Sequence, residues 1–208
     1  MMESLLVPAA AAAGLAIGRA VAPLARRYDA DFTDAWAWGT SALTAVVFAV
    51  LTIGVGARAA LPACLVLGAV GSLLGVIDVR VKRLPDPLTL PAYPAGAVLL
   101  AIAAAFTPDG ALKFAHAVIG LIVLWAMYWI QHFLFPDAIG RGDVKLAGVL
   151  GLHLGWFGQD AWLLGVLGGF LLGGVYAFAV ILRGGSRKSE FAYGPFMLLG
   201  ALIGISAG

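Results

Sequence analysis

Two aspartates lie at the ends of apolar segments, where a carboxylate is costly to keep. Asp78 follows the run GAVGSLLGVI, and Asp143 opens another apolar stretch after Gly140-Arg141-Gly142. A charge at the edge of a membrane span is unfavourable unless it is paired or used, so each is a candidate functional group. Two carboxyls in one site could hydrolyse a peptide bond. The ionised one would take a proton from water, and the protonated one would donate to the carbonyl oxygen.

The two acids differ in their position on the predicted helices. Asp143 begins a helix and lies close to Lys145, and the helix dipole favours a negative charge there. Asp78 ends a helix, where the dipole disfavours a negative charge. Because two carboxyls that share a site do not easily ionise together, we hypothesise that Asp143 is the carboxylate and Asp78 holds the proton.

The composition predicts what kind of scaffold must position these acids. The chain has 208 residues, 62% of them hydrophobic and 12% charged, with a mean hydropathy of +0.99. A soluble domain carries about 25% charged residues. We therefore expect an all-α polytopic membrane protein, with residues 1–208 forming one membrane-embedded domain. The single cysteine, Cys64, excludes an internal disulfide and a cysteine-cluster zinc site.

Apolar segments of suitable length predict about eight transmembrane helices. They cover about 4–24, 38–56, 60–78, 88–106, 112–135, 144–157, 161–182 and 192–207, and the sixth is short and rich in glycine. With the N-terminus outside, 11 of the 13 basic residues fall in cytoplasmic segments, and only Arg58 and Lys113 fall outside. This bias predicts both termini outside and both aspartates at the cytoplasmic face. Glycines at four-residue spacing, Gly151 with Gly155 and Gly165 with Gly169 and Gly173, predict close helix packing.

Three motifs in order resemble the type IV prepilin peptidases, a group of GxGD membrane aspartic proteases. The first is Asp78 followed by a basic stretch and Leu84-Pro85-Asp86. The second is Gly140-Arg141-Gly142-Asp143-Val144-Lys145-Leu146, and the third is Phe191-Ala192-Tyr193-Gly194-Pro195-Phe196. The resemblance covers most of the chain. Longer members carry an N-methyltransferase region with paired CxxC ligands between the first two spans, but here that gap is only 26–37 and lacks cysteine.

The resemblance implies a prokaryotic inner-membrane endopeptidase, in a short form that lacks methyltransferase activity. Its partners would be prepilin or pseudopilin precursors, each with a basic leader, a glycine before the scissile bond and an apolar helix after it. Asp78 and Asp143 would be catalytic, and no cofactor, metal or nucleic acid would be needed. Membrane lipids would surround the spans, while the oligomeric state, the particular precursor and the organism stay open.

The remaining motif residues have positioning roles in this interpretation. Gly140 and Gly142 lack a Cβ, so they allow a tight turn and close approach of an extended substrate. Pro85, Asp86 and Lys145 would shape the loops around the acids. Asp86 is also expected to be the N-cap of the fourth span, with Pro87 at the first helical position.

Three other functions stay open from the sequence. A related preflagellin-type GxGD peptidase would share the site and differ in substrate. A small transporter could use Asp78 and Asp143 for proton or cation coupling, although both acids lie near one face and no inverted repeat is present. A non-catalytic assembly protein is the third. The histidines, His116, His132 and His153, are scattered among different spans and predict no metal site.

Overall fold

The protein is described by a computed structural model that covers residues 2–136, 139–183 and 192–208. In these ranges the chain is helical and contains no strand. The elements are α1 (Met2–Val21), the 3₁₀ helix η1 (Ala22–Arg27), α2 (Asp34–Val55), α3 (Leu61–Val81), α4 (Asp86–Ala105), α5 (Gly110–Leu134), α6 (Arg141–Trp156), α7 (Gln159–Leu182) and α8 (Gly194–Ala207). The eight α-helices of the described residues match the eight predicted segments, which confirms the all-α fold class.

Six of the described helices, α1 to α5 and α7, are long and apolar enough to cross a membrane. The helix α8 is apolar but has only 14 residues, and α6 has 16. At 1.5 Å per residue α6 is about 24 Å long, which is shorter than the apolar core of a bilayer. It is also the most enclosed of the helices, since almost every residue from Val144 to Trp156 is buried. The chain is therefore a multi-pass membrane protein with a short helix at its centre.

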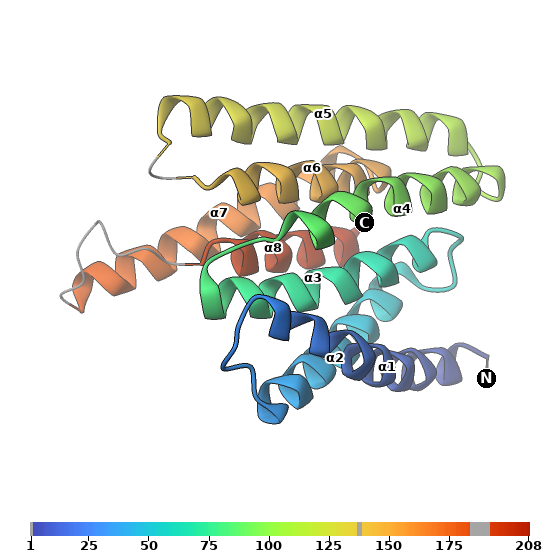
Figure 1. Cartoon of the computed structure of the whole chain (residues 1–208). Coiled ribbons are helices and arrows are strands. Elements are labelled where there is room, and N and C mark those ends of the chain that lie inside the picture. The colour runs from blue at the N-terminus through green and yellow to red at the C-terminus, as the bar shows by residue number, and fades with distance from the viewer. Residues whose placement is uncertain (1, 137–138, 184–191) are drawn as a thin grey trace.

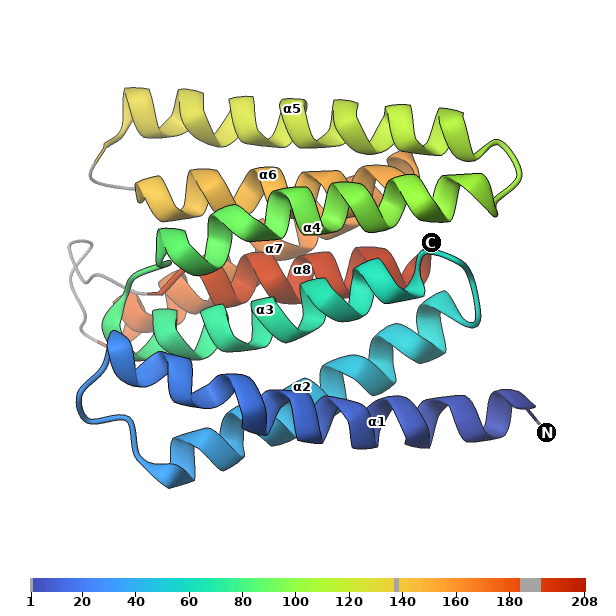
Figure 2. The same cartoon turned by 45° about the vertical axis from the view of Figure 1, so that its right-hand side comes forward.

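Neighbouring helices in the sequence pack as antiparallel pairs. The pairs α1 with α2, α5 with α6 and α7 with α8 make the most extensive contacts, and α3 and α4 join these pairs into one bundle (Figure 1). In both cartoon views the connections α1–α2 and α3–α4 lie at one end of the bundle, together with the ends of α5 and α7 and the starts of α6 and α8 (Figure 2). The two termini lie at the opposite end. We call the first end the motif end, because it contains the ends of α3 and the starts of α4, α6 and α8.

Glycine allows the paired helices to approach closely, as the four-residue spacing predicts. A methyl group on Gly120 of α5 would lie 2.5 Å from the carbonyl oxygen of Gly151 in α6. Likewise, a methyl group on Gly200 of α8 would lie 2.8 Å from the Cα of Gly169 in α7. Any side chain at these positions would force the backbones apart, so the small residues fix the separation between the helices.

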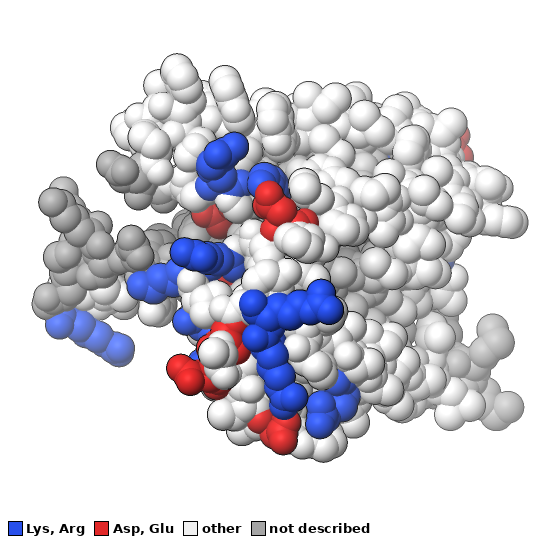
Figure 3. All heavy atoms as spheres, viewed as in Figure 1, with Lys and Arg blue, Asp and Glu red and all other residues white. Residues whose placement is uncertain are grey.

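Charged side chains gather at the motif end. The space-filling view shows Lys, Arg, Asp and Glu concentrated over this end, while the rest of the visible face is almost free of charge (Figure 3). The predicted topology requires this arrangement, since Arg19, Arg80, Arg141 and Arg183 lie at or next to the helix ends that meet here. Arg187 and Lys188, which the sequence places with them, lie outside the described residues.

Candidate active site

Asp78 lies in the last turn of α3, and the start of α8 holds its side chain. The carboxylate is buried, with 5% of the residue exposed, and its Oδ2 accepts a hydrogen bond of 2.9 Å from the backbone N–H of Gly194. The helix ends just beyond, because Lys82 takes a left-handed conformation with φ of 52° and its N–H bonds the carbonyl oxygen of Asp78. The side chain and the backbone of Asp78 are thus both fixed.

Asp143 lies in the first turn of α6. Its Oδ2 accepts a hydrogen bond of 3.0 Å from the backbone N–H of Gly140, the extended residue that precedes the helix. This is the carboxylate half of a capping box. Ile139, which precedes Gly140, is also held in place, because Nδ1 of His132 lies 2.7 Å from its carbonyl oxygen. Asp143 itself is half-buried.

The fold brings the helix ends that carry these two acids together, because Leu84 contacts both Gly142, next to Asp143, and Gly194, which binds Asp78. The charge of Asp78 acts electrostatically on Asp143, and Asp143 acts in turn on Tyr128 and Tyr193. The hydroxyls of these two tyrosines lie 3.3 Å apart and join α5 to the start of α8. Two carboxyls that are 65 residues apart in the sequence thus lie close enough for the charge of one to act on the other.

Leu84 packs the three motifs against one another. A methyl group on Gly142 would lie 2.9 Å from the Cβ of Leu84, and a methyl group on Gly194 would lie 3.4 Å from its Cδ2 and 2.8 Å from the Oδ2 of Asp78. Leu84 is itself buried. Gly142 and Gly194 are consequently the positions where the connection after α3 touches the starts of α6 and α8.

The second aspartate of the first motif forms an ion pair with the second motif. Asp86 Oδ1 lies 2.6 Å from Lys145 Nζ, and the hydroxyl of Tyr93 donates a hydrogen bond of 2.6 Å to the carbonyl oxygen of Lys145. Both contacts join α4 to α6. Pro85 precedes α4 with an extended conformation, and its carbonyl oxygen accepts hydrogen bonds from the N–H and hydroxyl of Thr89.

The predicted capping role of Asp86 is wrong. The N-cap of α4 is Pro85, while Asp86 is the first helical residue and Pro87 follows it. The side chain of Asp86 makes no capping bond and is directed to Lys145 instead. An ammonium group at hydrogen-bonding distance is a stronger partner for a carboxylate than a neutral backbone N–H.

The helix dipoles do not distinguish the two acids in the way that the sequence predicted. Asp143 lies at the N-terminus of its own helix, as expected. Asp78 ends α3, but it accepts a hydrogen bond from Gly194, the first residue of α8. Each carboxylate therefore faces the positive end of one helix, and the dipole alone does not decide which of the two holds the proton.

An ion pair next to the site was missed by the sequence analysis. Arg80 Nε lies 2.6 Å from Oδ2 of the buried Asp29, its guanidinium covers the ring of Trp36 at 4.8 Å, and it also donates to the carbonyl oxygen of Asp31 at 3.3 Å. Asp29 lies between η1 and α2, outside the membrane-spanning helices. The hydrogen bond from Arg80 holds the pKa of the Asp29 carboxyl below its usual range. The pair attaches the first connection to the helix end that carries Asp78.

The described residues contain no cluster of side chains that could hold a metal ion. Across residues 2–136, 139–183 and 192–208, no three His, Cys, Asp or Glu side chains come together. Of the histidines, His132 contacts a carbonyl oxygen at the start of the α6 motif, and His153 is buried with its Nδ1 2.9 Å from the carbonyl oxygen of Val149. The third motif is described from Ala192 onward, and Phe191 lies outside the described residues.

Comparison with known proteins identifies the family. A model described as the type IV leader peptidase family matches residues 65–178, which is more than half of the chain and includes both aspartates. The chain belongs to the type IV leader peptidase family. The match begins in α3 and ends in α7, so it contains the end of α3 and the starts of α4 and α6 but excludes α8.

Curated relatives of the leader peptidase family agree with this assignment. A prepilin leader peptidase/N-methyltransferase of Aeromonas salmonicida is 33% identical over 168 residues, or 80% of this chain and 55% of that protein. Its Escherichia coli K12 counterpart is 33% identical over 139 residues, or 64% of this chain and 57% of that protein. The chain thus spans about half the length of the curated relatives it matches. No solved structure matches.

Proposed function

We propose that the chain is an aspartic endopeptidase that removes the basic leader from prepilin-like precursors. The observation that carries this proposal is that Asp78 and Asp143 lie at helix ends packed on the same residue, Leu84, and that each carboxylate is bound by a backbone N–H at the start of a helix. This geometry occurs in a member of the leader peptidase family, and the relatives bear the name prepilin leader peptidase. Catalysis by two carboxyls needs no cofactor.

The two acids would divide the work of hydrolysis. One carboxylate takes a proton from a water held between the pair, and the resulting hydroxide attacks the carbonyl carbon of the scissile peptide. The other carboxyl donates its proton to the carbonyl oxygen, which gives a tetrahedral diol. When the C–N bond breaks, a proton moves to the leaving amine and the pair returns to its shared-proton state. Because both acids have one N–H donor, we assign the proton to the pair and not to one residue.

The surrounding residues would position the two acids. Leu84 fills the space beside Gly142, where a methyl group would lie 2.9 Å from its Cβ, so this glycine lets the connection after α3 pack against the turn that carries Asp143. The Lys145–Asp86 pair and Pro85 hold the start of α4 against α6, so these residues act through the position of Asp143 and do not react themselves. The basic residues at this end would set the orientation of the chain, with the site at the cytoplasmic face of the inner membrane.

Cleavage without methylation is the activity we propose. The residues between η1 and α2 are 28–33, and they contain no cysteine. These residues therefore cannot supply the cysteine ligands of a zinc-binding methyltransferase region between the first two spans.

Incubation of the purified chain with a precursor tests this function. The precursor carries a short basic leader, a glycine, and an apolar helix in a bilayer or detergent micelle. Mass spectrometry of the products is expected to show one cut directly after the glycine. An intact precursor under conditions where the chain remains folded would contradict the proposal, and transport of protons or cations by the reconstituted chain would favour the transporter.

A further inference from the structure

A pair of tyrosine hydroxyls joins three helices beside the candidate site. Tyr128 of α5 and Tyr193, the residue before α8, have hydroxyl oxygens 3.3 Å apart. Both rings also pack against the ring of Phe170 in α7, with centroid separations of 5.7 Å and 6.3 Å. A methyl group on Gly173 of α7 would lie 2.6 Å from Cε2 of Tyr193, so this glycine leaves the space that the tyrosine ring occupies. The two hydroxyls are therefore held in place by α5, α7 and α8 together.

The register of α5 on α6 places Tyr128 beside the first turns of α6. The two helices are antiparallel, and a methyl group on Gly151 of α6 would lie 2.9 Å from Cβ of Leu124. About two turns further along α5, Nδ1 of His132 lies 2.7 Å from the carbonyl oxygen of Ile139. Tyr128 is midway between Leu124 and His132 on the same face of α5. The point opposite it, midway between Gly151 and Ile139, falls in the first two turns of α6, where the second aspartate lies.

Tyr193 is connected to the other acid through the backbone. The N–H that binds Asp78 Oδ2 at 2.9 Å belongs to Gly194, which follows Tyr193 directly. The carbonyl oxygen of Tyr193 accepts hydrogen bonds from the N–H groups of Phe196 and Met197 in the first turn of α8. The backbone of Tyr193 is thus fixed on both sides, and its ring extends from the residue that holds Asp78 toward α5.

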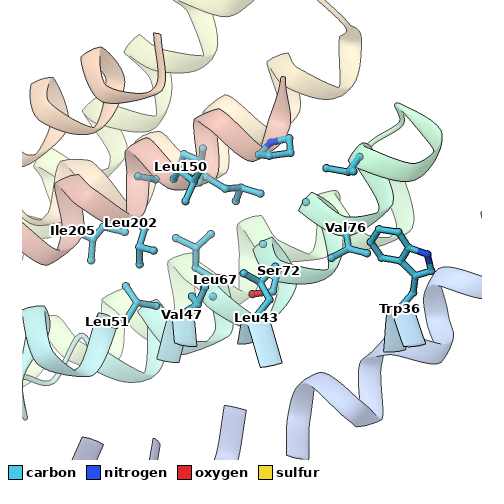
Figure 4. A pocket seen from close by; sticks show the side chains of 18 residues that line it. Trp36, Leu43, Val47, Leu51, Leu67, Ser72, Val76, Leu150, Leu202 and Ile205 are labelled. Atoms are coloured by element: carbon cyan, nitrogen blue, oxygen red, sulfur yellow. The ribbon is translucent and has the colours of Figure 1, made fainter. Parts of the chain in front are cut away.

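The side of the site toward α2 offers no comparable hydroxyl. A pocket there lies between α2, α3 and α8, and it begins at Val79 and Pro195, the chain neighbours of Asp78 and Gly194. Leucine, isoleucine and valine make up most of the labelled side chains in Figure 4, and Ser72 supplies the hydroxyl among the described residues that line the pocket. Ser72 precedes Asp78 by six residues, or about 9 Å along the helix. Side-chain hydroxyls next to the acids are therefore those on the side of α5 and α7.

Two hydroxyls that bond each other have one proton left for another acceptor. Tyr128 is only 3% exposed, and a buried tyrosine hydroxyl requires a hydrogen-bond partner, which Tyr193 provides. When Tyr128 donates to Tyr193, the proton of the half-buried Tyr193 is directed away from the pair. The charge of Asp143 acts on both hydroxyls, so its carboxylate attracts this proton.

We propose that the Tyr128–Tyr193 pair donates a hydrogen bond to the carboxylate of Asp143 and positions it in the candidate site. This inference rests on the proposed peptidase function and adds two residues to the same site. A hydroxyl that donates to a carboxylate fixes its orientation and stabilises its ionised form. Tyr193 acts on Asp143 directly, and Tyr128 acts through Tyr193. Both are positioning residues, because neither bonds to the atoms that react.

Removal of each hydroxyl tests the pair, because phenylalanine keeps the ring and its packing. In Tyr193→Phe the carboxylate loses a donor and takes up a proton more easily, so a higher pH is needed for activity. We expect the acid limb of the pH dependence of kcat/KM to move up by about one pH unit, and kcat at the pH optimum to fall about tenfold. A purely structural role of the ring would leave the acid limb in place. An unchanged acid limb in Tyr193→Phe overturns the inference.

A double variant tests the order of the two hydroxyls. Tyr128→Phe alone should move the acid limb in the same direction by less than Tyr193→Phe does, and it should add nothing in the Tyr193→Phe background. Independent, additive effects would contradict a relay through Tyr193. The control is Tyr176→Phe in α7, which is 46% exposed and whose ring contact with Phe196 phenylalanine preserves. Its pH dependence should equal that of the wild type.

The other groups near Asp143 that carry or take up charge are the same in all of these variants. They include Asp78 of α3, Asp86 of α4, His132 of α5, and Arg141 and Lys145 of α6. A difference between the tyrosine variants and the wild type therefore comes from the hydroxyls.

A direct titration of Asp143 tests the pair without any cleavage. The infrared band of its protonated carboxyl is the one that Asp143→Asn removes from protein labelled with ¹³C-aspartate, and this band is followed with pH. Its midpoint should lie about one pH unit higher in Tyr193→Phe than in the wild type. Equal midpoints overturn the inference, whether or not the protein cleaves a precursor. A higher midpoint in Tyr193→Phe, together with a wild type that cleaves nothing, contradicts the proposed function and supports the hydroxyl pair as the donor to Asp143.

Discussion

The backbone N–H of Gly194 donates a hydrogen bond of 2.9 Å to Asp78 Oδ2, which connects α8 to α3 across 116 residues of sequence. The same glycine leaves no space for a side chain, since an added methyl group would lie 2.8 Å from that oxygen. Gly194 therefore supplies a hydrogen-bond donor and the space that the carboxylate needs. Its position explains why the third motif of the sequence belongs to the same site as the two aspartates.

Gly194→Ala should displace Asp78 and slow cleavage. The methyl group and Oδ2 cannot both keep their positions, and a displacement of about 1 Å in a catalytic group costs up to 100-fold in rate. We expect kcat to fall at least tenfold, measured with a fixed precursor in detergent. The control is Gly39→Ala in α2, where an added methyl group meets nothing within 4 Å. Equal rates for the two variants would show that Asp78 tolerates the methyl group.

The Asp86–Lys145 ion pair should contribute little to stability. Both side chains are partly exposed, at 53% and 28%, and exposed ion pairs contribute at most about 1 kcal/mol. In a double-mutant cycle of Asp86→Asn and Lys145→Met, we expect a coupling energy of less than about 1 kcal/mol in the free energy of unfolding. A positioning role predicts a moderate loss of kcat in each variant. If either variant abolished cleavage while remaining folded, the residue would have to act in the chemistry itself.

The Asp29–Arg80 pair should make stability depend on pH in one direction. Because the pKa of Asp29 is lowered in the folded protein, its contribution is present above its ordinary pKa of about 4 and is lost as the pH falls through the lowered value. Asp29→Asn should therefore lower Tm at pH 7, and the difference from the wild type should shrink below about pH 4. The control is Asp109→Asn in the connection between α4 and α5, at the end of the bundle opposite to Asp29. A difference that stays constant down to pH 2 would contradict the ion-pair explanation.

The sequence predicts the helices well, because in an apolar chain the length of each uncharged segment fixes where a span can lie. All eight predicted segments correspond to helices, including the short one that became α6. The distribution of basic residues also places the connections correctly at alternate ends of the bundle. Orientation relative to the cytoplasm follows from the same charges and stays a prediction.

The site was less predictable than the fold. The motifs indicated Asp78, Asp143 and the glycines, but spacing along the chain says nothing of contacts between distant segments. Asp29 and Arg80 are 51 residues apart, and neither belongs to a pattern that indicates the other. The role of Asp86 was misassigned because a local cap and a distant ion pair give the same sequence signal. The dipole difference was also misleading, since the helix that faces Asp78 begins at Gly194, far along the chain.

The central claim is that Asp78 and Asp143 act as one catalytic pair, and their single amide variants test it most directly. Asp78→Asn and Asp143→Asn are measured for cleavage of a basic-leader precursor, with Asp160→Asn at the exposed start of α7 as the control. We expect each of the first two variants to lose cleavage while remaining folded in the membrane, and Asp160→Asn to cleave as the wild type does. Cleavage retained by both Asp78→Asn and Asp143→Asn would contradict the account.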